Sequence, residues 1–179
     1  MNTKIESCGN FTLGTSARIS DPCYDSNTWC AGTLHKVLPG KWEAFIERDS
    51  ETDRIGHLWA RHSSHATLKR EDINLRTDID VGVDAGLAGI YDLDYFNQYH
   101  KPKKDDQEDP EHYTWYRTNI IRFGKKDYKV IDDKCVISCT GWGDGSYICN
   151  IAKDDQDNIV GIHLDYLMDY EEEDEEYEE

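Results

Sequence analysis

Apolar and polar positions alternate along much of the chain, and this pattern predicts a protein built mainly of β-strands. Neighbouring side chains of a strand point to opposite faces, so apolar residues at every second position indicate a strand with one buried face. Short apolar runs between turn residues indicate strands that are buried more completely. The ranges that show one of these patterns are 11–19, 33–38, 42–47, 55–62, 81–91, 134–140, 146–151 and 159–166.

The glycine-rich stretch 141–145 is predicted to close a hairpin between the strands on either side of it. A wide loop gives this hairpin one wholly apolar face, whereas a two-residue turn would place Ile137 opposite the polar Asn150. We therefore expect the wide loop, whose glycines allow positive φ. The facing pairs in this register are Cys139 with Tyr147, Ile137 with Cys149, and Cys135 with Ile151.

Two further turns separate predicted strands. Pro39 and Gly40 are typical turn residues, so the strands 33–38 and 42–47 are expected to form a second hairpin. A polar turn at 154–158 leads into the last strand. The apolar face predicted for that strand consists of Val160, Ile162, Leu164 and Tyr166.

Three other segments have distinct patterns. The stretch 81–91 is small, apolar and rich in glycine, which predicts one buried strand that passes close to another backbone. Asp92 is expected to cap a short helix that runs through Gln98. Pro110 is expected to open an aromatic-rich helix that reaches about Arg122. The apolar positions of that helix are Tyr113, Trp115, Tyr116 and Ile120. Residues 69–76 fit a short helix or an exposed loop equally well.

Together these elements predict a mainly β fold, a β-sandwich or a partly open barrel of antiparallel strands with one or two short helices. A length of 179 residues is enough for one domain with a substantial core. We place that domain at residues 1–168 and interpret 101–112, which is charged throughout and contains two prolines, as a surface insertion.

The net charge of the chain restricts its partners. Its formal value is −17, and nine of the residues from 169 to 179 are acidic, so the rest of the chain carries −8. Residues 169–179 are predicted to be a disordered acidic tail, which either attracts a basic partner protein or only aids solubility. Nonspecific binding to nucleic acid or to an anionic membrane is not expected, because it requires clustered Lys and Arg.

The cysteines and the N-terminus bear on the compartment. Residues 1–13 contain no apolar segment typical of a signal peptide, and no apolar run is long enough to span a bilayer. We therefore expect the cytoplasm of a bacterium or of an infected host, where the six cysteines remain thiols.

Several motifs occur in an order that resembles an uncharacterised bacterial domain family, with similar chains in phage genomes. The resemblance covers roughly residues 14–166 and implies a β-rich cytoplasmic domain with no established activity and no catalytic residues to carry over. A phage origin would favour a small accessory protein that engages a host factor. The motifs are ISDPCY (19–24), LPGKWEAFI (38–46), RIGHLWARHS (54–63), VGVDAGLAGIYD (81–92) and GWGDGSY (141–147).

Asp21, Asp84 and Asp144 lie inside these motifs, and we call them the motif aspartates. If their loops meet at one end of a sheet, three carboxylates could bind a divalent cation or act as acid and base. The alternative is that each stabilises local backbone: Asp21 in a turn before Pro22, Asp84 as an acceptor of backbone N–H groups beside Gly86, and Asp144 by holding the glycine-rich loop. One-dimensional spacing does not separate these two possibilities.

Other candidate chemistry is weaker. His57, His62 and His65 do not share one face of a strand, and no Cys-x-x-Cys pair occurs, so we predict no metal site and no cofactor. Cys139 or Cys149 beside a histidine could act as a nucleophile, but nothing nearby in the sequence lowers the pKa of either thiol.

The residues that we expect to contact a ligand or a partner are in the glycine-rich loop and the Asp-Pro motif. A large ring between loop glycines often borders a pocket or an interface, which favours Trp142 for this role. The full set is Trp142, Gly143, Asp144 and Tyr24.

The leading functional hypothesis is a non-catalytic binding or interaction module that engages a basic host protein or sequesters a small ligand. One alternative is a metal-assisted hydrolase that uses the motif aspartates. A second alternative is a structural or assembly protein.

Overall fold

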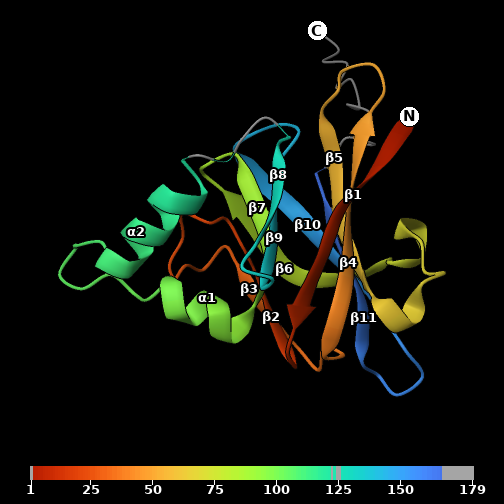
Figure 1. Ribbon diagram of the computed structural model, residues 1–179, viewed down its shortest axis with the longest axis horizontal. Helices are drawn as coiled ribbons and strands as arrows, with labels where there is room; N and C mark the ends of the chain where they lie inside the picture. Colours follow the sequence, from red (N-terminus) through yellow and green to blue (C-terminus); the bar gives the residue numbers. More distant parts are fainter. Residues whose placement is uncertain (1, 122, 124–125, 167–179) are drawn as a thin grey trace, which may run out of the picture.

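The structure, a computed structural model, describes residues 2–121, 123 and 126–166, and it contains eleven strands in two sheets (Figure 1). The strands are β1 (Thr3–Leu13), β2 (Ser16–Ser20), β3 (Gly32–His35), β4 (Gly40–Asp49), β5 (Ile55–His62), β6 (Leu75–Val83), β7 (Leu87–Asp92), β8 (Tyr128–Ile131), β9 (Cys135–Cys139), β10 (Gly145–Lys153) and β11 (Ile159–Asp165). The six-stranded sheet has the order β1-β4-β5-β11-β10-β6, and the five-stranded sheet has the order β3-β2-β7-β9-β8. Neighbouring strands in both sheets are antiparallel.

Apolar side chains from both sheets fill the space between them. Leu58 of β5 and Ile162 of β11 point inward from the six-stranded sheet, and both are fully buried. Ile90 of β7 and Val136 of β9 meet them from the five-stranded sheet. Burial of two inner faces against each other is the arrangement of a β-sandwich, which confirms the predicted fold class.

Two helices cover the outer face of the five-stranded sheet (Figure 1). They are α1 (Leu93–Tyr99) and α2 (Pro110–Asn119). Phe96 and Trp115 from these helices pack against Tyr91 of β7 and Cys135 of β9. As a result β7 and β9 are buried on both faces.

The outer face of the six-stranded sheet is covered by the segment 63–74, which contains the 3-10 turns η1 (Ser63–His65) and η2 (Arg70–Asp72). A Cβ on Gly161 of β11 would lie 2.8 Å from side-chain atoms of Leu68 and Ile73, so this segment rests directly on the strand. It also explains the ambiguous range 69–76, which is a 3-10 turn followed by the start of β6.

Several local predictions are confirmed. The strand predicted at 55–62 is β5. The side chain of Asp92 accepts a hydrogen bond from the backbone N–H of Tyr95 and caps α1. Pro110 opens α2, which ends at Asn119, three residues before the predicted end. Residues 101–108 are exposed as expected, but His112, which we had assigned to the surface insertion, is buried in α2.

The hairpin predicted around the glycine-rich loop is wrong. Strands β9 and β10 do not pair with each other, because β9 belongs to the five-stranded sheet and β10 to the six-stranded sheet. Val136 of β9 faces the core between the sheets, whereas Cys135 and Ile137 face the helices. Since β9 is apolar on both faces, the face that we had matched to β10 is buried against α1 and α2 instead. The loop 140–144 therefore crosses from one sheet to the other.

Two further predictions fail for the same reason. Strands β3 and β4, on either side of Pro39, lie in different sheets. The stretch 81–91 is two strands, β6 and β7, and the turn at 84–86 also crosses between the sheets. Gly86 at this turn has φ +69°, a conformation that favours glycine.

The last strand differs in one position. A β-bulge shifts the register between β10 and β11, where Ala152 pairs with Gly161 but Lys153 pairs with Ile159. The extra residue changes which side chains face inward. Val160 therefore packs on the outer face with Trp59, whereas Ile162, Leu164 and Tyr166 keep the predicted inner face.

Within the described residues, no helix combines the length and the apolar character needed to cross a membrane. The acidic tail predicted at 169–179 lies outside the described residues.

Candidate functional site

Asp21 follows β2 directly, and its fully buried carboxylate organises the loops at one end of the sandwich. One carboxylate oxygen accepts the backbone N–H of Cys23 at 2.7 Å. The other accepts the backbone N–H groups of Asp84 and Ala85 at 2.8 and 2.7 Å. The turn role that we gave as the alternative for Asp21 is thus confirmed, and it extends to the β6–β7 turn.

The β6–β7 turn and the β9–β10 loop lie side by side. Val83 pairs with Gly145 in one sheet, and Leu87 pairs with Cys139 in the other. The backbone N–H of Thr140 donates to the carbonyl of Gly86 at 3.0 Å between them. The loops that carry the motif aspartates therefore meet at one end of the sandwich.

The three carboxylates nevertheless have different surroundings. That of Asp21 is inside the protein, whereas Asp84 and Asp144 are exposed. Asp84 donates its own backbone N–H to Asp21, and its side chain forms a hydrogen bond with the Tyr24 hydroxyl. Tyr24 lies beside Asp84, and burial and then hydrogen bonds with Cys30 and Asp84 raise the pKa of its hydroxyl.

Trp142 projects from the glycine-rich loop, and its side chain is 56% exposed. The guanidinium carbon of Arg54 lies 4.7 Å from the centre of its ring. The carbonyl of Gly143 accepts the hydroxyls of Thr140 at 2.6 Å and Tyr147 at 2.8 Å, so the base of the loop is fixed. A ligand or partner role for Trp142, Gly143, Asp144 and Tyr24 stays a prediction.

The cysteines are free thiols in this structure. Burial raises the pKa of Cys139 to about 11 and that of Cys149 to about 12, so both remain protonated at neutral pH. A protonated thiol is a poor nucleophile. The geometry therefore gives no support to the cysteine nucleophile that we had considered.

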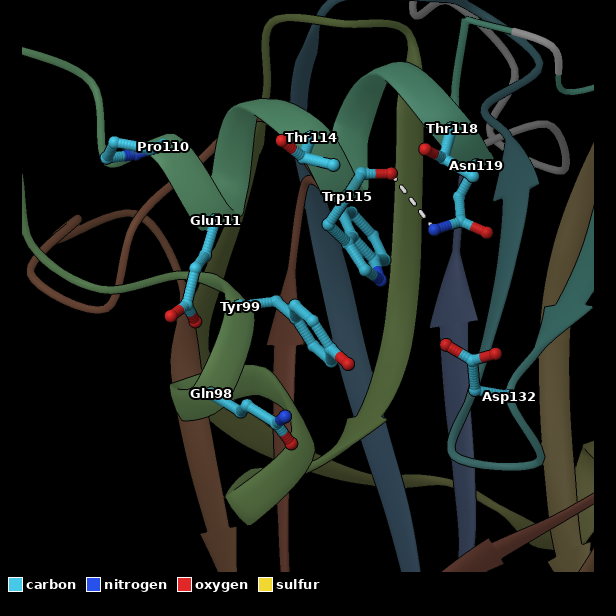
Figure 2. A pocket seen from close by; sticks show the side chains of 9 residues that line it. All are labelled: Gln98, Tyr99, Pro110, Glu111, Thr114, Trp115, Thr118, Asn119 and Asp132. Atoms are coloured by element: carbon cyan, nitrogen blue, oxygen red, sulfur yellow. Dashed lines mark hydrogen bonds between the residues drawn. The ribbon is translucent and has the colours of Figure 1, made fainter.

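A surface groove between α1 and α2 has a volume of about 630 Å³, and we call it the α1–α2 groove (Figure 2). Its walls come from both helices and from the turn between β8 and β9. Figure 2 shows the ring of Tyr99 and the carboxylate of Asp132 directed into this space, with Trp115 above the ring. The lining residues are Gln98, Tyr99, Pro110, Glu111, Thr114, Trp115, Thr118, Asn119 and Asp132.

A short hydrogen-bond chain fixes the floor of the groove. The indole N–H of Trp115 donates to the hydroxyl oxygen of Tyr95 at 2.7 Å. The Tyr95 hydroxyl in turn donates to Oδ2 of Asp132 at 2.6 Å. Burial and then the bond to Asp132 raise the pKa of Tyr95, so the hydroxyl keeps its proton and remains the donor. The carboxylate of Asp132 is thereby held at the edge of the groove.

Among the described residues, the nine that line the groove include two carboxylates and neither Lys nor Arg. Glu111 is partly neutralised by Lys101, whose Nζ lies 3.2 Å from its Oε2. The rings of Tyr99 and Trp115 are nearly parallel, with an angle of 27° and centroids 6.4 Å apart. The groove therefore combines aromatic surface with negative charge.

A second cluster lies on the outer face of the six-stranded sheet. His57 of β5 is cross-strand from Asp165 of β11 and diagonal to His163. The Nδ1 atom of His57 is 2.9 Å from Nε2 of His163 and 3.6 Å from Oδ1 of Asp165. Burial, then His57 and Arg70, lower the pKa of His163 to about 3. Among the described residues, these three form the group of side chains that could hold a metal ion.

Sequence reasoning missed both of these places. It paired His57 with His62 and His65, although alternate residues of one strand share a face, and His163 and Asp165 have that spacing. The groove depends on Asp132, which follows β8 in a turn and belongs to no motif that we had singled out. Only Trp115 of its lining was expected to be apolar and buried.

Comparison with known proteins places residues 60–164 in a family. The model of the family described as "Protein of unknown function (DUF4241)" matches residues 60–164, which include the motifs 81–92 and 141–147. A search of curated proteins and a search of solved structures each gave no match. The matched range is more than half of the 179 residues and confirms the resemblance to an uncharacterised domain family. The chain therefore belongs to the DUF4241 family of proteins of unknown function.

Proposed function

We propose that the protein is a non-catalytic binding module whose α1–α2 groove takes an Arg or Lys side chain of a basic partner protein. The observation that carries this proposal is the carboxylate of Asp132, held by the Tyr95 hydroxyl at 2.6 Å beside the rings of Tyr99 and Trp115. A cation bound there gains a charge-assisted hydrogen bond from the carboxylate and cation–π attraction from an aromatic face.

The charge of the whole chain supports the same partner. A net charge of −17 attracts a basic protein over long distances and raises the rate of its association. The hydrogen-bond chain from Trp115 to Asp132 holds the carboxylate in place before a partner arrives. Such preorganisation reduces the entropy lost on binding.

The test is a titration of the full chain with a short arginine peptide, followed by nuclear magnetic resonance. The indole N–H of Trp115 reports on the groove because it belongs to the hydrogen-bond chain. The matched probe is the same peptide with citrulline, which keeps the shape of arginine but lacks its charge. We expect saturable shifts with arginine and affinity at least about tenfold weaker with citrulline, since a hydrogen bond to a charged group contributes about 1.5–3 kcal/mol.

The matched variants are Asp132→Asn and Asp155→Asn. The first retains an acceptor for Tyr95 and removes the charge of the groove, and the second removes an exposed charge in the turn between β10 and β11. Asp132→Asn is expected to weaken arginine binding about tenfold or more, and Asp155→Asn to leave it unchanged. Equal binding of arginine and citrulline peptides, or full affinity in Asp132→Asn, would show that the groove does not recognise a basic side chain.

A further inference from the structure

We propose that His57, His163 and Asp165 bind a divalent transition metal ion of the zinc class. The three donor atoms lie within 4.8 Å of one another. Both histidines are buried, and the side chain of Asp165 is 13% exposed. This group is separate from the α1–α2 groove, because it lies on the opposite outer face of the sandwich and does not depend on the function proposed above.

The backbone explains why these side chains converge. His163 and Asp165 are two residues apart on β11 and therefore share a face, and His57 lies on the neighbouring strand opposite Asp165. Cross-strand neighbours have Cβ atoms about 4.5–5.5 Å apart, close enough for their side chains to reach one ion. The sheet thus positions all three ligands on rigid elements without help from a loop.

Two of the three donor-atom distances are close to those around a metal ion, and the third is within 4.8 Å. Tetrahedral zinc has bonds of about 2.0–2.2 Å to nitrogen and oxygen, which places its ligand atoms roughly 3.3 Å apart. The 2.9 Å between the two imidazoles and the 3.6 Å from His57 to Asp165 lie on either side of that value. The hydrogen shared by the imidazoles would move to the other nitrogen of its ring, so that both rings remain neutral and present a lone pair.

The donor set selects the class of metal. Two imidazole nitrogens and one carboxylate oxygen suit Zn²⁺, Co²⁺ or Ni²⁺, whereas Mg²⁺ and Ca²⁺ prefer oxygen ligands. The nearby charges of Glu47 and Arg70 largely compensate each other, because Nε of Arg70 lies 2.6 Å from Oε2 of Glu47. Asp165 is then the carboxylate that favours a cation.

A cavity of about 380 Å³ lies on the same outer face as the cluster. Its lining includes Glu47 and Trp59, the cross-strand neighbours of His57 and His163. The indole N–H of Trp59 is buried and has no hydrogen-bond partner in the described part of the chain. Such an orphaned donor beside the site fits a water or anion held on the ion.

The test uses the full chain after treatment with a chelator, titrated with zinc chloride alone. We expect one zinc ion per chain by calorimetry and a rise in the unfolding temperature, because a ligand of the native state stabilises it. X-ray absorption of the zinc-loaded wild type should show only nitrogen and oxygen neighbours at about 2.0–2.1 Å. Sulfur neighbours at about 2.3 Å would instead identify a cysteine site and overturn the proposal.

Variants then locate the site. Asp165→Asn and His163→Gln should each weaken zinc binding at least about tenfold, since even indirect partners of a metal contribute that much. The control is His65→Gln, which removes a histidine whose ring lies 6.5 Å from that of His62 outside the cluster. No zinc binding, loss of binding in the control alone, or normal binding in Asp165→Asn would each refute the assignment. The absorption spectrum of the wild type tests the proposal even if the His163 variant does not fold.

Discussion

The buried carboxylate of Asp21 accepts hydrogen bonds from three backbone N–H groups that would otherwise bond to water. Its removal would leave those donors without this partner. A buried unsatisfied donor costs about 1–3 kcal/mol, so we expect Asp21→Ala to lower the free energy of unfolding by about 3 kcal/mol or more. Asp21→Asn keeps one oxygen acceptor and should cost less. Urea unfolding measures both variants.

The control for this prediction is Asp144→Asn, because Asp144 is exposed. A surface substitution of this kind usually changes stability by no more than about 0.5 kcal/mol. If Asp21→Ala were as stable as Asp144→Asn, the carboxylate would not hold the loops together, and the motif aspartates would again be open to a catalytic role.

His100 is a second residue with a measurable individual effect. It is fully buried, and its ring stacks on Phe96 with centroids 4.1 Å apart. Burial and then the neighbouring His112 lower its pKa to about 3, against about 6.5 in the unfolded chain. Below pH 6.5 the unfolded state therefore binds one more proton, and the stability contributed by neutral His100 is lost as the pH falls from about 6.5 towards 3.

Urea unfolding at pH 7, 6 and 5 checks this linkage. Each buried neutral histidine contributes a slope of about 1.4 kcal/mol per pH unit to the free energy of unfolding. The range from pH 5 to 7 lies above the ordinary pKa of most carboxyl groups, so their titration adds little to this slope. We expect His100→Phe to lose the slope of one proton, whereas His35→Gln, at an exposed position, should keep it. An unchanged slope in His100→Phe would mean that the buried imidazole becomes charged without cost.

At the scale of whole elements, the residue types predicted the starts of the two helices best, Asp92 before α1 and Pro110 at the start of α2. Asp92 caps α1 through Oδ2, and its Oδ1 also accepts the backbone N–H of Gly14 at 2.8 Å. Asp109 caps α2 through a hydrogen bond from the backbone N–H of His112. Both caps depend on local chain geometry, and local geometry can be inferred from neighbouring residues.

The two caps give a matched pair of variants. Asp109→Ala should lower the free energy of unfolding by about 1 kcal/mol, the usual value for a helix cap. Asp92→Ala should cost more, because it also removes the acceptor of the Gly14 backbone N–H, which is partly buried. Chemical unfolding of both variants measures the difference, and an equal loss would show that the contact with Gly14 adds nothing.

Strand pairing was predicted less well than helix capping. Alternation identified β5 and the inner residues Ile162 and Leu164, because burial of one face depends only on the period of the side chains. The same period does not state which sheet a strand joins. A glycine-rich turn such as 84–86 or 141–145 can reverse the chain within one sheet or carry it across to the other. The double-sided burial of β9 decides between these outcomes, and it depends on helices that are distant in the sequence.

The candidate sites were also hard to predict, because the sequence does not state which distant elements come together. The loops of the motif aspartates converge, which the sequence left open, and the buried position of Asp21 follows only from the packing of the two sheets. The α1–α2 groove needs Tyr99 and Asp132 from separate elements. Only the spacing of His163 and Asp165 was visible in the sequence, and its partner His57 is more than a hundred residues away.

In the molecule as a whole, the two candidate sites lie on opposite outer faces of the sandwich. The helices and the α1–α2 groove cover one outer face, and the cluster of His57, His163 and Asp165 lies on the other. The net charge of −17 acts on both faces over distances set by the salt concentration. Short-range recognition in the groove and long-range attraction by the chain are therefore separable by experiment.

Deletion of residues 169–179 removes nine acidic side chains and leaves a formal charge of −8. At about 20 mM salt the screening length exceeds about 20 Å, so this deletion should weaken binding of the arginine peptide. At about 500 mM salt the screening length falls below about 5 Å, and the deletion should have no effect. The loss of affinity in Asp132→Asn should persist at both concentrations, because the carboxylate of Asp132 contacts the basic side chain directly.

A tail of equal length with Gln and Asn in place of Glu and Asp controls for chain length. If the deletion leaves affinity unchanged at low salt, attraction by the tail is excluded, and the groove together with the charge of −8 on the rest of the chain must account for recognition of the basic side chain.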